Sequence, residues 1–207
     1  MCAVLLALLA ALAVVDGGSA LLHVDRPVQL WVLDRRAGWA SSLARAATEL
    51  GAPASAFVAG LLLAALAGRR SPAIGLGLLS LTLVRPLVSA GLKAAIDRDR
   101  PAVGALVSAS GQSLPSGHTL AAAVLAGSAL LAAAAYRPRI APAWSAVAAA
   151  PVALVGATRV YLGVHWLSDV VAGALVGGLL LALVWMLLIR GGFGSPPVRP
   201  ASLPSPP

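Results

Sequence analysis

The chain has 207 residues, of which 59% are apolar and 11% are charged, and its mean hydropathy is +0.91. This composition excludes an ordinary soluble globular domain and predicts an integral membrane protein. The net charge is +8, but the basic residues are scattered among apolar segments. That scatter argues against nucleic-acid binding and favours contacts with lipid headgroups or phosphate groups. The single cysteine, Cys2, excludes an internal disulfide and a cysteine metal cluster.

Apolar segments of the length that crosses a membrane as helix follow one another along the chain. They cover residues 3–22, 50–67, 73–96, 119–136, 140–157 and 170–189. Strands are not expected, because an open sheet edge cannot be satisfied in lipid. The predicted fold is therefore all-α, a polytopic membrane bundle of about six transmembrane helices. Residues 1–190 form one domain, and the Gly-, Pro- and Ser-rich residues 191–207 are expected to be a disordered tail.

The first apolar segment resembles a signal peptide at Gly18-Ser19-Ala20, but no basic residue precedes it. We therefore expect it to be retained as a helix. Residues 22–49 mix charged residues with Trp31 and Trp39, which predicts an amphipathic segment lying in the membrane interface.

The loops indicate how the bundle is oriented. Arg69, Arg70, Arg137 and Arg139 fall in alternate loops and predict a cytoplasmic face, provided that the basic residues of the opposite face are functional. The loops after the first, third and fifth helices then lie on the extracytoplasmic face.

That opposite face carries three polar clusters. In chain order they are Lys93 with Arg100-Pro101, then Pro115-Ser116-Gly117-His118, then Arg159 with His165 and Asp169. They resemble the type 2 phosphatidic acid phosphatase family, or lipid phosphate phosphatases, whose pattern is Lys-x6-Arg-Pro, Pro-Ser-Gly-His and Ser-Arg-x5-His-x3-Asp. Order and spacing match throughout. Thr158 stands where the pattern usually has serine and keeps the hydroxyl.

The two histidines predict the catalytic chemistry. His165 and Asp169 are four residues apart and share a face of a helical turn. A carboxylate on one ring nitrogen fixes the tautomer and leaves the other nitrogen as a nucleophile for phosphorus. His118 then protonates the leaving oxygen as general acid and later accepts a proton from the attacking water.

The remaining cluster residues are predicted to bind phosphate. Ser116 is an N-cap candidate, Gly117 lets backbone approach a ligand, and the open amides of a helix start favour an anion. Lys93, Arg100 and Arg159 supply positive charge for the non-bridging oxygens, so no metal or other cofactor is expected.

The resemblance implies a metal-independent lipid phosphatase with substrates such as undecaprenyl diphosphate, phosphatidic acid or phosphatidylglycerol phosphate. An outward-facing site slightly favours the prenyl diphosphate. A vanadium-dependent haloperoxidase shares these anion ligands, but its fold is soluble. The alternative from another class is a lipid carrier or scaffold, which would not need both histidines and all three cations.

Several other polar residues have less defined roles. Arg85 lies within the third span beside Pro86 and is either functional or has a helix-kink or interface role. Asp97, Arg98 and Asp99 are expected to be able to pair among themselves. His23 belongs to no motif.

Overall fold

The computed structural model describes residues 19–137 and 143–190, and this part of the chain contains helices and no strand. The helices in chain order are α2 (Ser19–Asp34), α3 (Gly38–Thr48), the short 3₁₀ helix η1 (Glu49–Gly51), α4 (Pro53–Gly68), α5 (Pro72–Ile96), α6 (Gly117–Tyr136), α7 (Ala143–Tyr161) and α8 (Leu167–Arg190). The predicted all-α fold is confirmed. Residues 1–18 of the first apolar segment, Arg139 and the tail at 191–207 lie outside the described residues.

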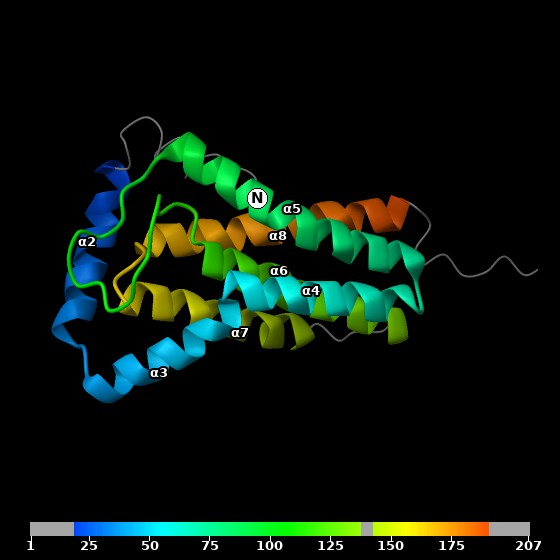
Figure 1. Cartoon of the computed structure of the whole chain (residues 1–207), viewed down its shortest axis with the longest axis horizontal. Coiled ribbons are helices and arrows are strands. Elements are labelled where there is room, and N and C mark those ends of the chain that lie inside the picture. The colour runs from blue at the N-terminus through cyan, green and yellow to red at the C-terminus, as the bar shows by residue number, and fades with distance from the viewer. Residues whose placement is uncertain (1–18, 138–142, 191–207) are drawn as a thin grey trace, which may run out of the picture.

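Helices long and apolar enough to cross a membrane occur at Gly38–Gly68, Pro72–Ile96, Gly117–Tyr136 and Leu167–Arg190, with a shorter apolar helix at Ala146–Tyr161. The predicted spans at 73–96, 119–136 and 170–189 match three of these helices, the span at 50–67 lies within Gly38–Gly68, and the span at 140–157 overlaps Ala146–Tyr161. The helices α4 to α8 run alongside one another as a bundle, while α2 and α3 lie across one end of it (Figure 1). The protein is therefore a polytopic helical membrane protein.

Small residues allow α6 and α8 to pack closely. A Cβ atom on Gly173 would lie 2.6 Å from the carbonyl oxygen of Ser116, and one on Gly177 would lie 2.6 Å from the Cβ atom of Ala123. The Ser116 amide donates to the carbonyl of Asp169 at 2.9 Å. This contact brings the first turn of α8 against the first turn of α6, and so brings two of the predicted clusters together.

The opposite end of the bundle is held by Tyr136, the last residue of α6. Its hydroxyl donates to the carbonyl of Leu66 at 2.8 Å, and the Arg70 guanidinium lies 5.6 Å from the centre of its ring. The loops with the predicted site residues lie together at the end of the bundle covered by α2 and α3 (Figure 1). The prediction that the three clusters share one end is confirmed.

The predicted interfacial segment at 22–49 corresponds mainly to α2 and α3. Trp31 and Trp39 are 59% and 75% exposed, as expected for side chains at a membrane interface. Asp25 on the same segment is only 1% exposed, however. The segment therefore also contributes a charged side chain to the interior of the protein.

Candidate active site

His165 and Asp169 meet at the start of α8, as their spacing predicts. Nδ1 of His165 lies 3.3 Å from Oδ2 of Asp169, and the two residues are 2% and 0% exposed. The same oxygen accepts the Trp166 amide at 2.9 Å. His165 thus precedes the helix, and Asp169, in its first turn, caps the helix start through Trp166. A neutral His165 that donates from Nδ1 keeps its lone pair on Nε2.

The turn before His165 depends on Gly163. Its φ is +74°, in the left-handed region, and a Cβ atom there would meet the carbonyl of Gly104 and lie 2.7 Å from Nη2 of Arg36. Arg36 also donates from Nε to the carbonyl of Tyr161, the last residue of α7, at 2.9 Å. Glycine at this position allows α7 to end and the chain to return to the site within a few residues.

Burial keeps His165 neutral. It lowers the pKa of His165 from 6.5 to about 4, against the opposing effect of Asp169, and the charges of Arg100 and Arg159 lower the pKa further. At neutral pH the ring therefore holds an unprotonated nitrogen, as a nucleophile requires.

Arg100 faces that nitrogen. Its Nη1 atom lies 3.1 Å from Nε2 of His165. The guanidinium also donates to the carbonyls of Ser110, Gly111, Gln112 and Val164, at 3.1, 2.9, 3.1 and 2.7 Å. Burial lowers the pKa of Arg100, and Asp169 acts in the opposite direction. The predicted phosphate ligand is thus present beside the predicted nucleophile, and it is held by backbone oxygens.

The other two predicted cations approach the same place from different helices. Lys93 of α5 donates to the Gln112 carbonyl, which it shares with Arg100. Arg159 of α7 is 5% exposed and donates from Nη1 to the hydroxyl of Thr48 at 3.2 Å. Within the described residues its Nε has no hydrogen-bond partner. Arg159 therefore retains a buried donor that an anion can use.

The start of α6 supplies the other side of the site. His118 is the second residue of α6 and lies within electrostatic range of Arg159, His165, Arg100 and Lys93. Gly117 is open, since an added Cβ atom would meet only Ser89, at 3.8 Å.

Ser116 stands at the N-cap position, but its hydroxyl caps no amide and instead accepts a hydrogen bond from Thr119 at 3.1 Å. The predicted position is confirmed, and the expected side-chain cap is absent. The first amides of α6 lack acceptors within the helix, which suits an anion.

Arg98 corrects one prediction. It does not pair with Asp97 or Asp99; instead its Nη1 donates to Oδ1 of Asp169 at 2.7 Å, and the guanidinium is 3% exposed. Asp97 ends α5 in a left-handed conformation and accepts from the side chain of Gln112 at 3.0 Å. Sequence reasoning missed this partner of the Asp169 carboxylate because the two residues are 71 positions apart.

Arg85 takes no part in these contacts. It is 4% exposed and donates to the carbonyl of Pro53, at the first residue of α4, at 3.2 Å. This contact ties α5 to α4. Thr48 is a further contact of the site that no motif indicated.

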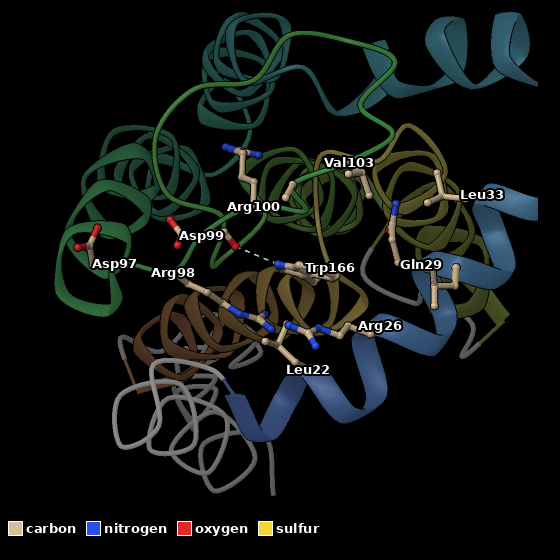
Figure 2. Close-up of a pocket in the computed structure, with 12 residues that line it drawn as sticks. Leu22, Arg26, Gln29, Leu33, Asp97, Arg98, Asp99, Arg100, Val103 and Trp166 are labelled. Atoms are coloured by element: carbon tan, nitrogen blue, oxygen red, sulfur yellow. Dashed lines mark hydrogen bonds between the residues drawn. The ribbon is translucent and has the colours of Figure 1, made fainter.

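A cavity of about 470 Å³ adjoins the site between α2 and the segment 97–103. Figure 2 shows Arg98 and Arg100 leaving that segment in different directions, Arg98 toward α2 and Arg100 away from it. The indole of Trp166 donates to the Asp99 carbonyl at 2.9 Å and braces the segment. Neither His118 nor His165 lines this cavity, so it lies beside the histidine pair.

Comparison with known proteins agrees with this geometry. Residues 1–190 match the family described as the PAP2 superfamily. The crystal structure of the first transmembrane PAP2 type phosphatidylglycerolphosphate phosphatase from Bacillus subtilis is similar, with a TM-score of 0.81 and 27% identity over 96% of this chain and 97% of that chain. The crystal structure of Aquifex aeolicus LpxE shares the fold, with a TM-score of 0.62 and 20% identity over 79% of this chain and 95% of that chain. A comparison with curated proteins finds no significant match. The family expected from the three motifs is confirmed, and the chain belongs to the PAP2 superfamily.

Proposed function

We propose that the protein removes the terminal phosphate from a lipid phosphate or diphosphate through a phosphohistidine on His165. The observation that carries the proposal is the environment of one imidazole ring. Nδ1 is held by Asp169 at 3.3 Å, and Nε2 faces the guanidinium of Arg100 at 3.1 Å. A fixed tautomer with its free lone pair directed at an anion-binding cation suits attack on phosphorus.

The proposed reaction has two steps. In the first, the Nε2 lone pair forms a bond to phosphorus, the bond to the leaving oxygen breaks, and His118 gives that oxygen a proton. In the second, water attacks phosphorus, His118 takes its proton, and the N–P bond breaks with its electrons returning to Nε2. Inorganic phosphate leaves, and both histidines are restored.

Positive charge for the transferring phosphoryl group comes from Lys93, Arg100 and Arg159, together with the first amides of α6. Arg100 has to turn its Nη1 donor from His165 to a phosphate oxygen before attack, because the same lone pair cannot accept and react at once. These cations support a metal-independent mechanism, since stabilising the equatorial oxygens is the task that metal ions perform elsewhere.

The substrate is proposed from the membrane fold and the relatives. The similar Bacillus subtilis protein is named a phosphatidylglycerolphosphate phosphatase, which supports phosphatidylglycerol phosphate as one candidate. Phosphatidic acid and undecaprenyl diphosphate are the others. We further propose that the site faces outward, because Arg69 and Arg70 mark the opposite end as cytoplasmic. An outward site favours a prenyl diphosphate exposed on that side.

A substrate panel tests the proposal. Detergent-purified protein is assayed for phosphate release from the three candidate lipids in EDTA, with His165→Ala as the matched control. We expect the wild type to release phosphate from at least one of the lipids, and the His165→Ala variant to release none. No phosphate release from any lipid would favour the alternative function of a lipid carrier or scaffold. Activity that is abolished by EDTA and restored by magnesium would contradict the metal-independent mechanism.

A further inference from the structure

A buried ion-pair network lies behind the catalytic carboxylate. Asp25 on α2 is 1% exposed and accepts from Nη2 of Arg98 through Oδ2 at 2.7 Å. Its two oxygens also accept from Ser168, from the amide at 2.9 Å and from the hydroxyl at 2.5 Å. Asp25 therefore joins α2 to the first turn of α8 and to the segment that follows α5.

The Arg98 guanidinium lies between two carboxylates. Nη2 bonds to Asp25, and Nη1 bonds to Oδ1 of Asp169 at 2.7 Å and to the hydroxyl of Ser168 at 2.6 Å. Its carbon atom also lies 5.8 Å from the centre of the Trp166 ring. A planar guanidinium can hold both partners in fixed directions, which a lysine ammonium cannot do equally well.

The two oxygens of Asp169 have separate partners. Oδ2 receives the His165 ring and the Trp166 amide, while Oδ1 receives Arg98 and, at a longer 3.4 Å, the hydroxyl of Ser113. A partial rotation of the carboxylate would move Oδ2 away from Nδ1 of His165. The short bond at Oδ1 opposes that rotation.

We infer that Arg98, held in place by Asp25, is a positioning residue that fixes the Asp169 carboxylate against His165. The inference rests on the proposed role of His165 as nucleophile. Outer partners of a catalytic histidine and its carboxylate commonly determine ring orientation and ring basicity. Asp25 thereby links the position of α2 to the orientation of the Asp169 carboxylate, although α2 carries none of the reacting groups.

A purely structural ion pair is the competing explanation. Burying charges costs desolvation, and removing one partner leaves the other uncompensated, so a single variant loses stability under either explanation. Loss of activity in Arg98→Gln alone therefore decides nothing. The two explanations are distinguished by a variant that regains thermal stability but still lacks the hydrogen bond from residue 98 to Asp169.

The test compares Asp25→Asn, Arg98→Gln and the double variant in a double-mutant cycle. The matched control is the exposed ion pair of Arg35 and Asp34, whose atoms lie 3.2 Å apart, altered in the same way to Arg35→Gln and Asp34→Asn. Melting temperature in detergent, kcat, KM and the NMR titration of His165 are measured for every protein.

We expect Arg98→Gln to lower both the melting temperature and kcat. The double variant recovers most of the melting temperature, while kcat remains about 10- to 100-fold low and KM changes little. The pKa of His165 rises in it, because the Asp169 charge is no longer shared with a guanidinium. Arg100, which touches the ring, and the nearby Arg159 are unchanged in these variants. The control pair leaves all these quantities unaltered.

Recovery of kcat and of the His165 titration together with the melting temperature would overturn the positioning role. Failure of the proposed function is recognised separately, by rapid-quench labelling of the wild type with ³²P-substrate. A wild type without labelled histidine removes the nucleophile assignment, whereas a labelled wild type with a fully active double variant removes only the role of Arg98.

Discussion

Nη1 of Arg100 lies 3.1 Å from Nε2 of His165. Arg100, which is expected to bind phosphate, therefore faces the lone pair of Nε2, which is expected to attack phosphorus. The same guanidinium is otherwise held by backbone carbonyls, of which that of Val164, the residue before His165, is the nearest at 2.7 Å. A phosphate entering the site therefore competes for a donor that already points at the reaction centre. In the proposed mechanism, binding of the substrate and release of the nucleophile are one event.

This relationship predicts that Arg100→Lys lowers kcat/KM by about 100-fold or more, the scale seen when one transition-state donor is removed. An ammonium cannot bond the loop carbonyls and two phosphate oxygens together. Vanadate, which in five-coordinate form on histidine resembles the transferring group, should inhibit the variant more weakly by a similar factor. Arg35→Lys, at an exposed position, is the control. An unchanged vanadate inhibition constant would count against Arg100 as a phosphate ligand.

His118→Ala should discriminate among leaving groups. Loss of a general acid slows the first step most when the leaving oxygen is strongly basic, because such an oxygen needs a proton as it departs. Rates of alkyl phosphates should therefore fall much more than those of nitrophenyl phosphate, measured under single-turnover conditions. Equal losses on both substrates would assign His118 a different role.

The protonation of His165 gives a prediction about pH. Since burial lowers its pKa to about 4 from 6.5, the unfolded chain binds a proton that the folded protein does not bind between these values. Stability contributed by the neutral ring is present above pH 6.5 and falls as the pH drops toward 4. The chain has three histidines, so imidazole NMR signals can be assigned by single substitutions. Titration of His165 near 6.5 would contradict the buried neutral ring.

The local parts of the site could be predicted from the sequence. The four-residue spacing of His165 and Asp169 and the helix start at His118 are set by neighbouring residues, and the structure keeps both. The apolar lengths also predicted the bundle, because a hydrocarbon core fixes how long a spanning helix must be.

The contacts between distant segments could not be predicted. Arg98 was expected to pair with its neighbours, yet it bonds to Asp25, 73 positions away. The left-handed end of α5 at Asp97 separates these neighbours, and no periodic pattern encodes such a turn. Likewise, the carbonyl of Gln112 accepts from both Lys93 and Arg100, and a backbone oxygen carries no residue-specific signal.

The orientation of the site predicts how single cysteines are labelled. In a Cys2→Ser background, Ser110→Cys should react with an impermeant thiol reagent in intact cells. Ser71→Cys, at the start of α5 and the opposite end of the bundle, should react only after permeabilisation. The reverse pattern would place the site on the cytoplasmic side and remove the argument for an outward-exposed substrate, without affecting the histidine chemistry.

The measurement that tests the account most directly is rapid-quench trapping of the intermediate with ³²P-labelled lipid phosphate. We expect protein-bound label that is lost in acid and kept in alkali, as for an N-linked phosphate. The label should be absent in His165→Asn, which lacks the nucleophile. Label retained in His165→Asn, or turnover by the wild type without any labelled protein, would contradict nucleophilic catalysis by His165.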